Sequence, residues 1–173
     1  YLVSLTVVWL KRDLRVSDHA PLFHAAQKGR VIPFYAIEPD YWQQPDTSLR
    51  QWQFARETLI ELDEQLSLLG QALWVATDSV ENCLSALLHQ YGVFRLFSHQ
   101  ESGNQWTCQR NRRIASWCKS NDISWVQFQP YGVVPGLKGR EEWSQRWHQY
   151  MSQATLPPPM SLVNTAAIPL RPE

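Results

Sequence analysis

The stretch that decides the fold is Trp9-Leu10-Lys11-Arg12-Asp13-Leu14-Arg15-Val16-Ser17-Asp18. A short apolar run, residues 5–10, stops at Leu10, and four charged residues follow within the next five positions. An apolar run that ends in charged residues is typical of a buried parallel strand whose carboxyl end reaches a polar site. Ligands of open α/β sheets bind at that end of the strands. The sequence therefore predicts a binding site directly after its first strand.

Further apolar runs follow at regular intervals, separated by segments with helical periodicity. They predict five strands, at residues 5–10, 31–37, 72–76, 93–98 and 123–128. Short apolar strands that alternate with helices are typical of a parallel sheet with helices on both faces. We therefore predict a Rossmann-like, doubly wound α/β fold with the common strand order 3-2-1-4-5.

Helix boundaries follow from turn and capping residues. The first helix is expected to begin near Asp18, with Pro21 in its first turn, and to stop by Gly29. A second, ending at Gly70, carries one apolar face made of Trp52, Ala55, Leu59, Leu62, Leu66 and Leu69. The third is expected to have Asp78 as N-cap with Glu81 three residues on, and to end at Gly92. The fourth spans residues 105–120.

The alternation of strands and helices stops after Phe128. Residues 129–140 are rich in glycine and proline, and a short helix is predicted for 141–151, with Trp143 and Trp147 on one face. The three prolines at 157–159 favour an extended spacer. We therefore divide the chain into an α/β domain, residues 1–151, and the start of an interdomain linker, residues 152–173, within a longer protein.

Composition limits the class of protein. Of 173 residues, 44% are hydrophobic, and 16 lysines and arginines balance 16 acidic residues, so bulk charge gives no argument for nucleic-acid binding. The three cysteines form no CxxC pair and no metal-binding spacing with histidine, which indicates reduced thiols and no bound metal. With no signal peptide and no long apolar run, we expect a cytoplasmic protein that does not contact a membrane.

Two polar segments meet in the predicted topology. In the order 3-2-1-4-5, the crevice lies between the ends of strands one and four, which lead into residues 11–18 and 99–104. Arg12 offers a planar donor fork, and Glu101 offers acceptors for the N–H groups of a pterin-like or flavin-like edge. His99 lies in the same segment, and Asn104 is placed to cap the next helix. We predict these four residues as the ligand-binding set.

Structural roles explain several other polar residues. Arg15 and Asp18 are expected to pair and brace the turn, and Asp13 to accept backbone amides of the loop. Scattered histidines, among them His19 and His24, are expected at the surface or at helix caps. The arginines at 110, 112 and 113 are either a small basic patch or, more commonly at such spacing, a solvated helix face.

Several catalytic and nucleotide-binding motifs are absent. The sequence contains no GxGxxG after the first strand, no GxxxxGK[ST], no GxSxG and no HExxH. The chemistry that the polar residues at the crevice offer is therefore binding chemistry.

Two segments resemble the DNA photolyase/cryptochrome family. Residues 9–22, WLKRDLRVSDHAPL, are similar to the opening motif of that family. Residues 99–107, HQESGNQWT, together with Arg110, resemble a second family segment. The runs at 31–35 and the leucine-rich helix that ends at Gly70 fit the same layout, so the resemblance covers most of residues 5–151. The sequence departs from the family at His19, where asparagine is usual, and at Asn111, where aspartate is usual.

The resemblance implies a light-harvesting N-terminal domain. In this family a five-stranded α/β domain houses an antenna chromophore, methenyltetrahydrofolate or a deazaflavin, and a linker leads to a helical domain that holds FAD. Arg12 and Glu101 match positions that contact the antenna in some members. The whole protein would then be a deoxyribodipyrimidine photo-lyase acting on damaged DNA. The alternatives are a blue-light photoreceptor (cryptochrome), a Rossmann-like nucleotide-binding domain without catalysis, and a docking domain with an empty crevice.

Overall fold

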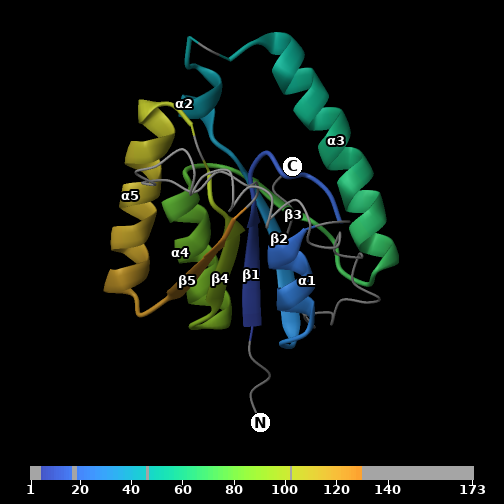
Figure 1. Cartoon of the computed structure of the whole chain (residues 1–173), viewed down its shortest axis with the longest axis vertical. Coiled ribbons are helices and arrows are strands. Elements are labelled where there is room, and N and C mark those ends of the chain that lie inside the picture. Colours follow the sequence, from blue (N-terminus) through green and yellow to red (C-terminus); the bar gives the residue numbers. More distant parts are fainter. Residues whose placement is uncertain (1–4, 17–18, 46, 102, 130–173) are drawn as a thin grey trace, which may run out of the picture.

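Five parallel strands form the centre of the structure (Figure 1). The computed structural model describes residues 5–16, 19–45, 47–101 and 103–129. The strands are β1 (Leu5–Leu10), β2 (Arg30–Ile37), β3 (Trp74–Thr77), β4 (Arg95–His99) and β5 (Ser124–Phe128). They pair in the order β3-β2-β1-β4-β5, so the predicted topology is confirmed, and each boundary lies within two residues of its predicted place.

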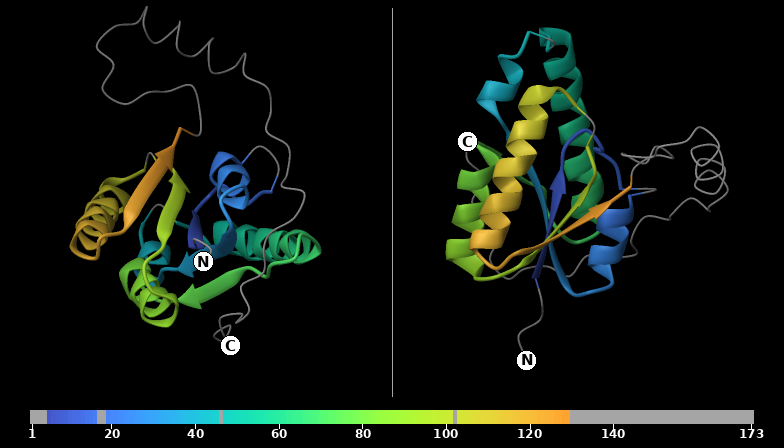
Figure 2. Two further views of the ribbon diagram at one scale, coloured as in Figure 1. Left: turned by 90° about the horizontal axis from the view of Figure 1, so that it is seen from below. Right: turned by 60° about the vertical axis from the view of Figure 1, so that its left-hand side comes forward.

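Helices cover both faces of the sheet (Figures 1 and 2). They are α1 (Ala20–Ala26), α2 (Pro39–Trp42), α3 (Leu49–Leu68), α4 (Val80–Tyr91) and α5 (Gln105–Ser120). In β1, Val7 and Trp9 face the core under α4 and α5, whereas Val8 and Leu10 face the core under α1 and α3. All six residues of β1 are buried, because the central strand is covered on both sides.

Helix α3 packs on the sheet through its second half. Leu59, Leu62 and Leu66 are buried and confirm the predicted apolar face there. A capping box between Ser48 and Gln51 begins the helix above the carboxyl ends of the strands, beside the short helix α2 (Figure 1). Trp52 and Ala55, the first half of the predicted face, are only partly buried. The Trp52 ring contacts Trp42 of α2, and Ala55 faces the cleft described below.

The predicted N-cap of α4 is wrong by one residue. Ser79 is the cap, and its Oγ accepts the Asn82 N–H at 3.3 Å. Asp78 instead accepts the Ser79 N–H at 2.7 Å and the Asn82 side-chain amide at 3.0 Å. Both residue types are good caps. Ser79 takes the role because its own backbone is extended and the helix begins at the next residue, Val80.

Helix α1 is capped by a histidine. His19 is buried, and its Nδ1 accepts the Leu22 N–H at 3.1 Å, in agreement with a capping role. Pro21 lies in the first turn as expected, and the helix ends at Ala26, three residues before Gly29. Asp18, and with it the predicted pair with Arg15, lies outside the described residues.

Other sequence predictions also fall outside the described residues. They are the helix at 141–151 with Trp143 and Trp147, and the boundary between residues 151 and 152. Within the described part of the chain, no helix is long and apolar enough to cross a bilayer. The three cysteines are free thiols, and burial raises the pKa of Cys83 to about 12 and that of Cys118 to about 11.

The packing of α3 predicts a position-dependent loss of stability. Leu66→Ala removes a fully buried side chain, so the free energy of unfolding should fall by ~2–5 kcal/mol. Leu68→Ala is the matched control, because Leu68 is 89% exposed, and its effect should stay within ~0.5 kcal/mol. Urea unfolding followed by circular dichroism measures both, and equal losses would contradict this packing.

Candidate ligand-binding site

A cleft opens at the carboxyl ends of β1 and β2. Its volume is about 870 Å³. Residues 9–15, the end of β2, helix α2, the first half of α3, and two side chains from the β4–α5 region line it. The predicted crevice lay between the ends of β1 and β4, whereas this cleft opens mainly over β1 and β2 and reaches the β4–α5 side only through Glu101 and Arg110. A volume of this size matches that of small-molecule sites, roughly 300–1,000 Å³.

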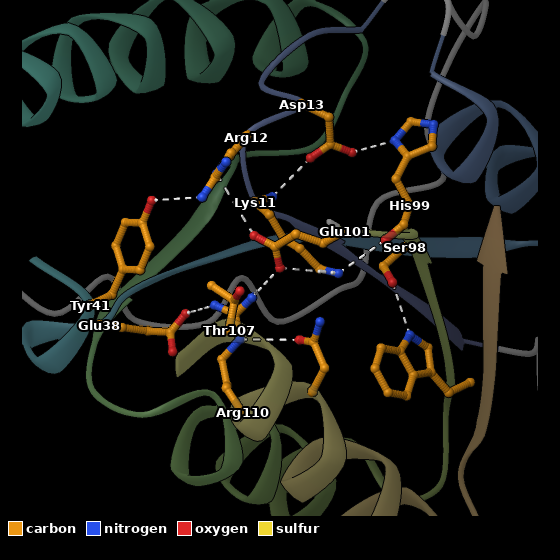
Figure 3. Close-up of polar contacts among 12 residues, drawn as sticks. Lys11, Arg12, Asp13, Glu38, Tyr41, Ser98, His99, Glu101, Thr107 and Arg110 are labelled. Carbon is orange, nitrogen blue, oxygen red and sulfur yellow. Dashed lines mark hydrogen bonds and ion pairs between the residues drawn. The ribbon is translucent and has the colours of Figure 1, made fainter. Parts of the chain in front are cut away.

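Arg12 crosses the cleft between two partners (Figure 3). Its Nη2 donates to the Tyr41 hydroxyl at 3.2 Å, and its Nε lies 3.9 Å from Glu101 Oε1. The Arg12 side chain is 59% exposed, whereas that of Glu101 is only 8% exposed. The guanidinium therefore remains accessible to a ligand while Glu101 and Tyr41 define its direction.

Arg110 forms the floor of the cleft. Its Nη1 donates to Glu38 Oε1 at 2.5 Å, and its Nη2 donates to Glu101 Oε2. The guanidinium carbon lies 5.0 Å from the ring centre of Trp9 and 5.4 Å from that of Trp106. One buried cation thus joins a residue that follows β2 to one that follows β4, across the end of β1 (Figure 3).

Lys11 supplies a second buried cation. Its Nζ donates to the His99 carbonyl oxygen at 3.0 Å and lies 3.7 Å from Glu101 Oε2. It also lies 4.3 Å from the ring centre of Trp9, within reach of a cation–π interaction. The end of β1 is therefore tied to the end of β4 by charge as well as by the sheet.

Burial shifts two pKa values in this network toward neutrality. Burial raises the pKa of Glu38 to about 7, although Arg110 opposes the rise. Burial also lowers the pKa of Lys11 to about 8, against the attraction of Glu101. Both groups can therefore change their charge near neutral pH.

Asp13 holds together the other side of the cleft loop. Its Oδ1 accepts the Lys11 backbone N–H at 2.9 Å, which confirms its predicted role toward loop amides. Its Oδ2 lies 2.6 Å from His19 Nε2 and 2.5 Å from His99 Nδ1. Burial disfavours the Asp13 carboxylate, but the hydrogen bonds from His19 and His99 outweigh it and hold the Asp13 pKa far below its usual range.

The same three side chains have the composition of a metal site, with donor atoms within 4.8 Å of one another. The hydrogen bonds around His19 do not suit one. Because His19 Nδ1 accepts the Leu22 N–H, its neutral ring carries the proton on Nε2. A metal at this place would need the lone pair of Nε2. Burial also lowers the pKa of His19, which keeps the ring neutral. The cluster is therefore suited to a hydrogen-bonded carboxylate.

The four predicted binding residues separate into two pairs. Arg12 and Glu101 come together in the cleft, as the strand order predicted. His99 lies at the end of β4 and contacts Asp13, and Asn104 caps α5 by accepting the Thr107 N–H at 3.0 Å. Neither His99 nor Asn104 is part of the cleft lining. Contact of any of the four with a ligand stays a prediction.

Sequence reasoning missed two residues of the floor. Glu38 directly follows β2, and a charge after an apolar run is the same signal that identified Lys11 and Arg12. The expectation that Arg110 belongs to a basic patch or solvated face is wrong, because the residue is only 3% exposed. It lies on the buried face of α5 with Thr107 and Ile114, and a charge on that face could have identified it.

Comparison with known proteins places the chain in a family. The family model described as DNA photolyase matches residues 6–136. A cryptochrome DASH of Arabidopsis thaliana, described as chloroplastic/mitochondrial, is 27% identical over 106 residues, which are 57% of this chain and 19% of that protein. The chain belongs to the DNA photolyase family.

Solved structures agree on the fold. A bacterial class III photolyase from Agrobacterium tumefaciens matches with a TM-score of 0.82 and 20% identity, over 100% of this chain and 38% of that one. An archaeal photolyase from Sulfolobus tokodaii matches with a TM-score of 0.73 and 20% identity, over 93% and 38%. The chain spans about a fifth of the length of the Arabidopsis relative, and its fold is that of the family's N-terminal α/β domain.

Removing the buried cation should destabilise the domain strongly. Arg110→Met keeps the aliphatic stem but leaves Glu38 and Glu101 without their shared partner, so the free energy of unfolding should fall by ~3–5 kcal/mol at pH 8. In the control Arg113→Met, the lost pair with Glu81 involves a side chain that is 54% exposed, and the fall should be under ~1 kcal/mol. Urea unfolding that gives similar losses for both variants would contradict a buried network.

The Asp13 cluster should stabilise the fold in a pH-dependent way. Its hydrogen bonds depress the pKa of Asp13 in the folded state, so the stabilisation is complete above the ordinary carboxyl pKa, about 4, and is lost as the pH falls further. Asp13→Asn should therefore lower the free energy of unfolding by ~2–3 kcal/mol at pH 7 and by progressively less below pH 4.

Urea unfolding at pH 7, 5 and 3 measures the difference in the free energy of unfolding between the wild-type chain and Asp13→Asn. Asp40→Asn is the control, because Asp40 is exposed and should change stability little at each pH. A constant difference between the wild-type chain and the Asp13→Asn variant from pH 7 to pH 3 would show that the carboxylate charge is not what stabilises the loop.

Proposed function

We propose that this chain is the light-harvesting domain of a photolyase-like flavoprotein and that the cleft holds an antenna chromophore. The observation that carries the proposal is the accessible Arg12 guanidinium above a floor of Glu101 and Arg110. Membership of the DNA photolyase family supports it. The photolyase from Sulfolobus tokodaii is described as having two FAD molecules, with the implication of a novel light-harvesting cofactor in that protein.

The chemistry of the cleft favours a flat ring with an anionic substituent. Trp9, Tyr41, Trp42 and Phe54 supply aromatic surface along its walls. Arg12, Arg15 and Arg50 are exposed members of the lining and make its outer part positive. A deazaflavin with a phosphate and methenyltetrahydrofolate with its carboxylates both combine these properties.

The predicted residues take two roles in this proposal. Arg12 and Glu101 contact the chromophore, Arg12 through its donor fork and Glu101 through Oε1, which faces Arg12. His99 and Asn104 hold the loop that carries Glu101, since His99 is bound to Asp13 and Asn104 begins α5. A substitution at either supporting residue would act through the position of Glu101.

The activity of the whole protein is part of the proposal. A following domain, reached through the linker that begins at residue 152, would hold FAD and bind damaged DNA. Light absorbed by the antenna would then drive the repair of pyrimidine dimers there. No residue of this chain is assigned a catalytic role. The cytoplasm remains our proposed compartment, although the Arabidopsis relative is described as organellar.

A blue-light receptor is the second candidate, because the Arabidopsis relative is a cryptochrome. Light-dependent repair of dimer-containing DNA by a protein that includes the flavin domain separates the two. A nucleotide-binding domain without light chemistry would instead bind ATP in the same cleft, and a docking domain would bind none of these ligands.

Arg12 provides the test of the antenna site. The chain should bind methenyltetrahydrofolate or FMN, the latter as a flavin stand-in for a deazaflavin, and Arg12→Ala should weaken the binding by ~10-fold to 100-fold, because a charged hydrogen bond is lost. Arg112→Ala, on the exposed face of α5, should bind as the wild-type chain does.

Fluorescence titration of the purified chain measures the affinities, with ATP as a third ligand. Failure of both chromophores to bind at about 1 mM, a weak affinity of roughly −4 kcal/mol, would remove the antenna proposal. Preference for ATP would favour the nucleotide-binding alternative.

A further inference from the structure

Only one of the two carboxylate oxygens of Glu38 accepts a hydrogen bond within the described part of the chain. Its Oε1 accepts the hydrogen bond from Arg110, and its Oε2 has no hydrogen-bond partner among the described residues. Glu38 lines the cleft, although the residue is only 8% exposed. Figure 3 shows its side chain directed at Arg110. A ligand seated against Glu38 would therefore exclude solvent from Oε2.

Charged groups from several elements surround Glu38. Arg110 of α5 is the attractive one, but Arg110 is shared with Glu101. Glu101 and, from α4, Glu81 repel a negative charge on Glu38, and Lys11, directly after β1, belongs to the same network. Tyr35 and Tyr41 of β2 and α2 add hydroxyl groups on the cleft side. Glu38 is thus the less well compensated of the two carboxylates on Arg110.

We propose that ligand binding in this cleft is coupled to the uptake of one proton by Glu38. The proton comes from solvent and bonds to Oε2, so that the neutral carboxyl group donates an O–H to the ligand. The partner atom is a carbonyl oxygen or an unprotonated ring nitrogen on a heteroaromatic edge. This inference rests on the proposed function and defines which edge of the chromophore faces the floor.

The direction of the coupling follows from desolvation. Removing water from a carboxylate disfavours its charged form, so the bound ligand stabilises the protonated state. Burial already raises the pKa of Glu38 to about 7, so a further rise changes its charge near neutral pH. A ligand that presented N–H donors to Oε2 would have the opposite effect and release a proton.

Calorimetry in two buffers of different ionisation enthalpy counts the protons. At pH 7.5 the binding of FMN or methenyltetrahydrofolate should take up about half to three quarters of a proton per ligand, because about a quarter of the Glu38 side chains are already protonated there. The affinity of the wild-type chain for FMN should fall several-fold from pH 7 to pH 8.5. That interval lies above the second phosphate pKa, about 6, so FMN itself stays in one state.

Two variants separate this inference from the antenna proposal. Glu38→Gln should still bind, with proton uptake clearly below that of the wild-type chain and a shallower pH profile in which Lys11 still titrates. Glu64→Gln, the same change on an exposed part of α3, should behave as the wild-type chain does. Binding without proton uptake in the wild-type chain, or with equal uptake in Glu38→Gln, overturns the inference and leaves the antenna proposal standing. Absence of binding overturns both.

A spectroscopic measurement covers the case in which Glu38→Gln does not fold. Glutamate labelled with carbon-13 reports the state of each carboxyl group in the wild-type chain at pH 7.5. One buried carboxyl resonance should move to the protonated position when ligand is added. If all glutamate resonances keep their ionised positions in the bound state, the inference is wrong.

Discussion

The shared guanidinium of Arg110 is the interaction on which the cleft depends. It reaches Glu38 after β2 and Glu101 after β4, and it lies against the ring of Trp9 at the end of β1. The ends of β1, β2 and β4 are thereby linked through side chains as well as through the backbone pairing of the sheet. Buried ion pairs often add little net stability, but breaking one leaves a costly uncompensated charge. The role of Arg110 is therefore to position the two carboxylates. Its removal would lower the free energy of unfolding, because both carboxylates would lose their shared partner.

A second cluster complements the first on the opposite side of the β1 loop. Asp13 contacts both His19, the cap of α1, and His99, at the end of β4. Lys11 also contacts His99, because its Nζ donates to the His99 carbonyl oxygen. Arg12 lies between the two clusters and is itself exposed. A side chain that is accessible to a ligand is thus supported by neighbours that are fixed, which is the arrangement that a specific binding site requires.

Much of this could be predicted from the sequence because it depends on local patterns. Alternating strands and helices indicated the sheet order, and that order brought Arg12 to Glu101, which are 89 residues apart. The pairing of Glu38 with Arg110 could not be predicted, since it depends on how α5 is rotated over the end of β2. The choice between Asp78 and Ser79 as N-cap depends on where the backbone turns from extended to helical. Two adjacent residues that both favour the cap position do not determine this. Helix α2, with four residues, is too short to give a periodic signal.

The central claim is that the cleft at the ends of β1 and β2 holds an aromatic chromophore against Arg12. A crystal structure of the chain with bound methenyltetrahydrofolate or FMN tests it most directly. We predict ring density between Arg12 and the aromatic wall, in contact with Glu101, with the anionic group toward the outer arginines. A chromophore bound elsewhere on the domain, with the cleft filled only by water, would contradict it.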